Sequence, residues 1–209
     1  MKKLPFNYAA FKAVSEFLSK DKYRLYLSGV YIEITKQDVR YTASNGLVLM
    51  TQKTTLECPQ ELETSAIIPV DKIVGLVDIC MKAIPKGLKE EAMRDRFLMS
   101  LEKDTFYVYE KTNGNDSTLL VEVPIVDACF PDYRKIIPEG ESESSSIALD
   151  PKLIAQVYKA YATYLGNKPP ALGFSLTGEK SPVLIKLLEK EQKENEEILT
   201  VLAAFKDKR

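Results

Sequence analysis

The sequence predicts a protein of mixed α and β structure in which one β-α-β-β-β unit occurs three times. Two observations predict this architecture. A short apolar run, a capping residue and an amphipathic helix recur in this order at three places, and strand-like runs follow each of the three helices. Internal repetition at a regular period is a strong indicator of how a chain is organised, because each copy is expected to fold in the same way.

The first unit contains a helix expected over residues 8–18, because Phe11, Val14 and Leu18 share one helical face. Asn7 precedes this helix and suits the N-cap, since its side-chain oxygen can accept a backbone N–H of the first turn. Three strand-like runs follow, at residues 25–34, 39–43 and 47–52.

The second unit repeats this order. An apolar run at residues 66–70 leads through Asp71, a second N-cap candidate, into a helix expected over residues 72–81. Strand-like runs follow at residues 97–101, 105–110 and 119–124.

The third unit is expected to start with a strand at residues 147–149. Asp150 suits the N-cap of the next helix, at residues 152–161, and Pro151 fits its first position. Strand-like runs follow at residues 171–176, 183–188 and 198–205, and the charge run 189–197 is expected to be a solvated hairpin loop.

The unit boundaries predict the domain organisation. Residues 139–146 are rich in Glu and Ser, which indicates a linker. We therefore expect residues 1–138 to form one domain of two units, and residues 147–209 to form a third unit, which is half a domain.

Composition limits the class of protein. The chain has 209 residues, 45% of them apolar, and a formal net charge of -1, so a packed core is expected and no overall positive field attracts nucleic acid. The three cysteines are far apart in the sequence, which favours free thiols in a reducing compartment, and we expect a cytoplasmic protein. No apolar run is long enough to span a bilayer, so no membrane partner is expected.

The chain contains no histidine, which excludes Ser-His and Cys-His nucleophile pairs and every histidine-containing zinc site. Three scattered cysteines are too few for an all-thiolate zinc site. Carboxylate, lysine or magnesium chemistry stays open, although no residues stand at the spacing that it needs. We expect no metal, no cofactor and no enzymatic activity.

Four segments carry a resemblance to a known family. They are RLYLSGVYIEI (24–34), VRYTASNGLVL (39–49), AIIPVDKIVGLVDI (66–79) and FPDYRKIIP (130–138). Their order and approximate spacing resemble the middle domain of bacterial DNA polymerase III beta sliding clamps, and residues 147–205 resemble the second half of that family's last domain. The chain therefore looks like about one and a half clamp domains.

This resemblance implies an α+β, DNA-clamp-like fold with the helices packed on one face of antiparallel sheets, lining a hole for DNA. It also implies a groove that binds a short linear segment of a DNA polymerase or another DNA-processing protein. The implied groove residues are Leu27, Ser44, Gly46, Leu47, Val48, Leu49, Pro138, Pro182, Val201, Leu202, Ala203, Ala204 and Phe205.

One part of the implied groove departs from the family. Where the family usually carries Thr-Asp-Gly-His-Arg-Leu, residues 44–49 read Ser-Asn-Gly-Leu-Val-Leu, so a more apolar groove with a different partner motif is expected. The alternative is that these residues are ordinary core packing, with Asn45 and Gly46 in a tight turn.

Helices that line a hole for DNA should carry cations on their outer faces. The candidates for weak, non-specific contact with double-stranded DNA are Lys12, Lys20, Lys72, Lys82, Lys152 and Lys159. The alternative is that each of them belongs to an ordinary solvated helix face.

Two functions follow from the resemblance. The leading one is a non-enzymatic, clamp-like processivity factor that tethers a DNA-processing enzyme; the alternative is an interaction module of the same fold, an adaptor, decoy or regulator that never encircles DNA. A ring of this family uses twelve units, so chains of three units would need four copies. We also expect the third unit to pair with its counterpart in another chain, giving a homo-oligomer, either a dimer or a tetramer.

Overall fold

The computed structural model describes residues 2–112, 116–138, 147–176, 181–188 and 195–203. The predicted linker at 139–146 lies outside these residues. So do Ala204 and Phe205, and most of the charge run that begins at Glu189.

Four helices and eleven strands make up the described part of the chain. The helices are α1 (Tyr8–Ser15), α2 (Asp71–Lys82), α3 (Lys89–Asp95) and α4 (Pro151–Tyr164). The strands are β1 (Leu4–Pro5), β2 (Val30–Ile34), β3 (Asp38–Ser44), β4 (Val48–Thr55), β5 (Thr64–Ile68), β6 (Phe97–Glu102), β7 (Thr105–Lys111), β8 (Ser117–Pro124), β9 (Leu172–Ser175), β10 (Val183–Leu187) and β11 (Glu196–Leu202).

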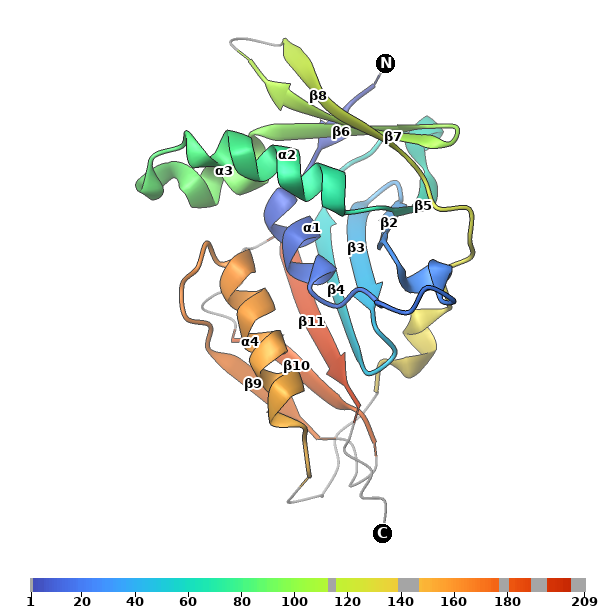
Figure 1. Cartoon of the computed structure of the whole chain (residues 1–209), viewed down its shortest axis with the longest axis vertical. Helices are drawn as coiled ribbons and strands as arrows, with labels where there is room; N and C mark the ends of the chain where they lie inside the picture. Colours follow the sequence, from blue (N-terminus) through green and yellow to red (C-terminus); the bar gives the residue numbers. More distant parts are fainter. Residues whose placement is uncertain (1, 113–115, 139–146, 177–180, 189–194, 204–209) are drawn as a thin grey trace.

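The strands form two antiparallel sheets, one of four strands in the order β1-β6-β7-β8 and one of seven in the order β5-β2-β3-β4-β11-β10-β9. Helices α1 and α4 lie in front of the seven-stranded sheet, and α2 lies directly below the four-stranded one in this view (Figure 1). The prediction of an α+β fold with helices on one face of antiparallel sheets is confirmed.

The first two units exchange their first strands. Strand β1 of the first unit pairs with β6 of the second, and β5 of the second unit pairs with β2 of the first. Gly29 makes the second exchange possible, because a Cβ at this position would lie 2.6 Å from the carbonyl oxygen of Ile68. The glycine of the LYLSGV segment is therefore required by a close approach of two backbones.

The third unit extends the sheet of the first unit. Strand β11 pairs with β4 in one continuous register from Glu196↔Thr54 to Leu202↔Val48, and α4 packs against α1. The main core therefore runs beneath the helices of all three units and is rich in aromatic side chains, including Phe6, Phe11 and Tyr161.

The predicted caps are mostly confirmed. Asn7 accepts a hydrogen bond from the amide of Ala10 at 3.0 Å, and Asp150 accepts one from Lys152 at 2.8 Å. The prediction for Asp71 is wrong, because this residue is already the first of α2 and Val70 occupies the N-cap. A carboxylate at this end of a helix still interacts favourably with the helix dipole.

Two other predictions need correction, and one element was missed. Leu25–Leu27, expected to start a strand, form a 3₁₀ turn. Residues 147–149, expected to be a strand, pair with no strand in the described part of the chain. Helix α3 was not expected, because KEEAMRD carries too few apolar residues to show a helical period.

Candidate peptide-binding groove and helix-lined face

The face of the seven-stranded sheet that points away from the helices carries a separate apolar cluster, called the outer cluster below. Its buried members are Leu27, Leu49, Ile67, Phe130, Tyr133 and Val201. Successive side chains of a strand point to opposite faces of the sheet, so β2 contributes to both clusters. Val30, Ile32 and Ile34 are buried in the main core, whereas Tyr31 packs against the outer cluster.

The FPDYR segment is fastened to this outer face by aromatic contacts. The ring of Phe130 stacks on that of Tyr31, with 4.6 Å between centroids and 3° between planes, and Tyr133 meets Phe130 edge-on at 6.2 Å. Offset and edge-on aromatic pairs contribute about 0.5–1.5 kcal/mol beyond their area burial. The segment therefore has a defined place on the sheet.

Glu33 holds the end of the same segment. The Tyr133 hydroxyl donates to Glu33 Oε2 at 2.7 Å, and Arg134 Nη2 donates to Glu33 Oε1 at 3.0 Å. Burial and the bond to the Glu33 carboxylate both raise the pKa of Tyr133. Glu33 was missed in the sequence, although its position two residues after Tyr31 puts it on the same outward face.

Strand parity divides the implied groove residues between the two faces. Leu49 and Val201 are cross-strand partners in the outer cluster, where Leu27 joins them. Val48 and Leu202 are also cross-strand partners, but their side chains belong to the main core on the helix side. A ligand on the outer face would meet only the backbones of Val48 and Leu202.

The β3–β4 turn lies at the end of the β4–β11 junction. The Ser44 hydroxyl is buried and donates to the carbonyl of Val48 at 2.9 Å, and Gly46 adopts a φ of 90°. Leu47 is 57% exposed, and its carbonyl accepts a hydrogen bond from the amide of Ala203 at 2.9 Å. Pro138 and Pro182 are partly exposed, and Ala204 and Phe205 lie outside the described residues.

Exposed apolar side chains border the outer cluster. Tyr26 adjoins Leu27 in the chain and is 37% exposed, and Ile136 precedes Ile137 and is 50% exposed. These residues give the cluster an apolar rim that water can reach, whereas the exposed Leu47 lines the groove on the helix side that is described below. The tight turn at Asn45 and Gly46 also agrees with the packing alternative, since Asn45 Oδ1 accepts the amides of Leu47 and Val48.

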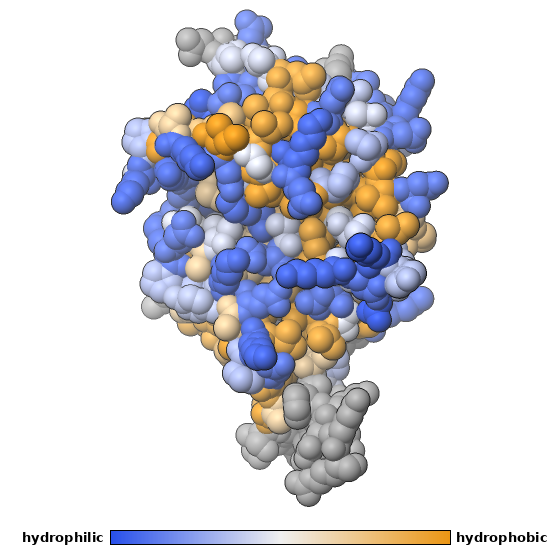
Figure 2. All heavy atoms as spheres, in the orientation of Figure 1, coloured by the Kyte–Doolittle hydropathy of each residue, from blue (hydrophilic) through white to orange (hydrophobic). Residues whose placement is uncertain are grey.

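The six candidate lysines lie on or next to the helices but differ in whether an acidic side chain pairs with them. Lys20, Lys82 and Lys152 are exposed and form no ion pair with any described residue, and Lys72 donates to the carbonyl of Glu122 at 3.0 Å. Lys12 is paired with Asp78 at 2.6 Å and Lys159 with Glu16 at 2.8 Å. Figure 2 shows hydrophilic residues across the middle of this face.

A groove of about 1040 Å³ opens on the helix-lined side. Residues of α1, α2, α4 and the β3–β4 turn line it, among them Lys12, Lys20, Gly75 and Gln156. Lys20 contributes to this groove a cation that forms no ion pair with any described acid.

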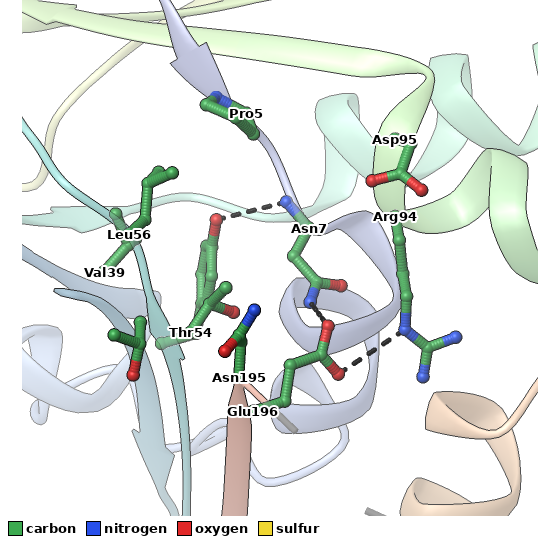
Figure 3. Close-up of a pocket in the computed structure, with 11 residues that line it drawn as sticks. Pro5, Asn7, Val39, Thr54, Leu56, Arg94, Asp95, Asn195 and Glu196 are labelled. Carbon is green, nitrogen blue, oxygen red and sulfur yellow. Dashed lines mark hydrogen bonds and ion pairs between the residues drawn. The ribbon is translucent and has the colours of Figure 1, made fainter. Parts of the chain in front are cut away.

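A buried polar network, absent from the sequence analysis, ties the three units together. Glu196 on β11 accepts hydrogen bonds from Asn7 Nδ2 at 3.1 Å and from Arg94 Nε at 3.5 Å (Figure 3). It also accepts one from the Tyr164 hydroxyl. Arg94 also donates to the carbonyl of Tyr164 at 3.1 Å, at the C-terminal end of α4. Burial, and then the nearby Glu196 carboxylate, raise the pKa of Tyr164.

This network lines a cavity of about 300 Å³ between β1, α3 and the end of β11 (Figure 3). The expectation that residues 189–197 form a solvated loop is wrong for its last residues, because Glu196 and Glu197 belong to β11. Because the run is rich in charged residues, its sequence did not indicate that β11 begins at Glu196, whose side chain is 9% exposed.

Among the described residues, no group of three or more Cys, Asp or Glu side chains is arranged to hold a metal ion. No helix in the same part of the chain combines the length and the apolar character needed to cross a bilayer. Cys58, Cys80 and Cys129 are free, as predicted.

No protein-family model matches the chain. Among curated proteins, the beta sliding clamp of Rickettsia felis is 28% identical over 162 residues, which cover 78% of this chain and 39% of the relative. The chain therefore spans well under half the length of the curated relative that it matches.

Solved structures agree on the fold. The DNA polymerase III beta subunit of Thermotoga maritima superposes with a TM-score of 0.65 at 15% identity, covering 98% of this chain and 65% of that one. The sliding clamp of Pseudomonas aeruginosa bound to griselimycin gives a TM-score of 0.67 at 14% identity, and the beta subunit of Streptococcus pyogenes gives 0.68 at 8%. Both matches cover 98% of this chain and 65% of the other. The chain has the fold of a beta sliding clamp in shortened form, as the resemblance implied.

Proposed function

We propose that this chain is a non-enzymatic, sliding-clamp-like processivity factor that tethers a DNA polymerase or another DNA-processing enzyme to double-stranded DNA. The observation that carries the proposal is the division of the clamp fold into two faces. One face gathers the helices and their lysines, and the other holds an apolar cluster with an exposed rim at the junction of the first and third units.

DNA is assigned to the helix-lined face. Lys20, Lys72, Lys82 and Lys152 carry charges that no described acid neutralises, so about four phosphate contacts per chain are available, which corresponds to a slope of log K against log salt of about −3 to −4. Weak contacts of this kind allow the protein to slide. Titration of duplex DNA with the protein at several salt concentrations measures the slope, and a slope near zero contradicts DNA binding through this face.

The partner peptide is assigned to the rim of the outer cluster. A short segment with one or two aliphatic or aromatic anchors would extend the cluster over Ile136 and Pro138. Pro182 and Ala203 border the same end of the sheet, because β10 begins and β11 ends beside the β3–β4 turn.

Ile136→Asp tests this assignment without disturbing the core, because Ile136 is 50% exposed. Partner proteins are captured from the native host and identified by mass spectrometry, and the identified segment is then titrated as a peptide. Ile136→Asp should weaken binding of the peptide at least tenfold, whereas Leu119→Asp, at a residue 47% exposed on β8, should leave it unchanged. Equal binding by Ile136→Asp and the unmodified protein contradicts the groove.

A second candidate function is an interaction module that binds clamp-type peptides without encircling DNA. It is favoured by the two ion pairs that occupy Lys12 and Lys159, because they leave fewer lysines free for phosphate contacts. The two functions differ in DNA binding, so the salt titration above separates them.

Self-association belongs to the leading function. We propose that the protein works as a homo-oligomer, a dimer or a tetramer, in which several copies together surround DNA. Two of the sheet edges, at β8 and β9, are available for this within the described part of the chain.

A further inference from the structure

The first two units follow one rule of strand exchange. In each of them, the strand before the helix pairs with the strand that follows the helix of the other unit: β1 with β6, and β5 with β2. In both, two residues separate the end of the strand from the start of the helix. Helix α4 begins at Pro151, so the same spacing of two residues places the end of the corresponding strand at Ala148.

The third unit has both halves of this exchange, and within the described residues neither is used. Ile147 and Ala148 pair with no described strand, and β9, which follows α4 as β2 follows α1, pairs with β10 alone among the described strands. A donor strand and an acceptor edge of matching type therefore lie in the same unit, and no described segment completes either of them.

The backbone of β9 is set up to receive a strand. The amide of Leu188 donates to the carbonyl of Ala171, and bonded pairs alternate along an antiparallel ladder, so Gly173 also faces β10. Leu172 and Phe174 consequently direct their N–H and C=O groups to the open edge. Open edges with unbonded backbone groups readily accept a further strand.

The flank of α4 above this edge is apolar. Ile154, Ala155, Tyr158 and Ala162 share it, none of them charged, and Tyr158 is 48% exposed. The opposite flank carries Gln156 and Lys159, and both contact Glu16 at the end of α1. Phe174 lies across from buried Ile185, so its side chain is on the helix side of the sheet, where it is 47% exposed.

We propose that a second copy of this chain covers this flank and edge, forming a symmetric dimer in which each third unit completes the other. Residues Ile147 and Ala148 of each chain add to β9 of the other, as β5 adds to β2, and the two α4 helices pack antiparallel. Tyr158 then lies at the two-fold axis, with Ala155 of one chain facing Ala162 of the other. An aromatic residue flanked by small ones is self-complementary in this arrangement, as an isologous interface requires.

The exposed area is sufficient for such a dimer. Tyr158 and Phe174 are about half exposed, and an aromatic side chain buries about 150–250 Å² when enclosed, so the two residues in both chains contribute about 400 Å². Two added strand segments and the rest of both helix flanks bring the total near the ~1,000 Å² of a specific interface. The uncharged flank also avoids the cost of burying unpaired charges at the two-fold axis.

The inference rests on the proposed function, in which several copies together surround DNA. In light scattering at tens of micromolar without DNA, the unmodified protein should have a mass that is an even multiple of 23.6 kDa. Phe174→Lys and Tyr158→Lys should each halve that mass. Leu119→Lys is the matched control, because Leu119 on the other open edge, β8, is also 47% exposed.

Cross-linking tests the two-fold axis directly. In a Cys129→Ser background, Tyr158→Cys should form an intermolecular disulfide on mild oxidation, whereas Tyr23→Cys, at a side chain 94% exposed outside the interface, should not. A monomeric unmodified protein, or an assembly broken by Leu119→Lys and not by Phe174→Lys, overturns the proposal. Assembly through β8 with salt-dependent DNA binding would overturn this dimer and leave the proposed function standing.

Discussion

Replacing Arg94 with Met tests whether the buried polar network fixes the third unit to the other two. The side chain of Arg94 is 4% exposed and that of Glu196 is 9% exposed. The change removes the guanidinium that donates to Glu196 and to the carbonyl of Tyr164, while it keeps an unbranched apolar stem. Glu196 is left as a buried carboxylate with Asn7 and Tyr164 as its remaining donors.

The expected loss is about 3–5 kcal/mol, because removing one partner of a buried ion pair leaves the other charge without compensation. For a chain of this size, that loss corresponds to a fall in Tm of roughly 6–20 °C. Arg96→Met provides the matched control. Arg96 also pairs with a carboxylate, Glu110 at 2.7 Å, but its side chain is 38% exposed, so a loss below about 1 kcal/mol is expected.

Urea unfolding followed by circular dichroism measures both variants. The double variant Arg94→Met with Glu196→Gln should recover part of the loss, because no buried charge remains unpaired, with a coupling energy of about 1–3 kcal/mol. If Arg94→Met costs no more than Arg96→Met, or if the double variant shows the sum of the two single losses, the network does not hold the units together.

Three further outcomes are expected. Gly29→Ala should cost about 1–3 kcal/mol in urea unfolding, since its Cβ would lie 2.6 Å from the carbonyl oxygen of Ile68. Gly75→Ala, with no atom within 4 Å of the new Cβ in α2, should instead stabilise by about 0.5–1 kcal/mol, and equal effects would refute the close approach. Tyr133→Phe should cost about 1 kcal/mol through the lost bond to Glu33, and an unchanged stability would show that this bond contributes nothing. A thiol reagent at pH 8 should label exposed Cys129 before Cys58, because burial raises the pKa of the Cys58 thiol and keeps it protonated to higher pH; equal labelling rates would contradict its burial.

Repetition in the sequence was sufficient to predict the architecture. Helical spacing and the caps at Asn7 and Asp150 located α1 and α4, because both signals are local. The exchange of β1 and β5 between units could not be predicted, since strand pairing depends on residues far apart in the chain. The missing strand at residues 147–149 has the same cause: its local pattern is that of a strand, but no described segment lies beside it to form a ladder.

The candidate site was predicted in part. Parity along β4 and β11 would have separated Leu49 and Val201 from Val48 and Leu202, whereas the resemblance treated them as one wall. The Arg94–Glu196 pair gave no sequence signal, because both residues lie in charged segments that normally face solvent. Whether a candidate lysine is ion-paired could not be predicted either, because it depends on acids in other helices, such as Asp78 beside Lys12.

The most direct test is retention on closed circular DNA compared with the same DNA after linearisation. A protein that encircles the duplex stays on a closed circle when raised salt weakens its phosphate contacts, and it leaves through the ends of a linear molecule. We expect protein assembled on circles to co-elute with them at raised salt and to be lost after a single restriction cut. Equal retention on both forms, or loss from both at the same salt concentration, would contradict a sliding-clamp function.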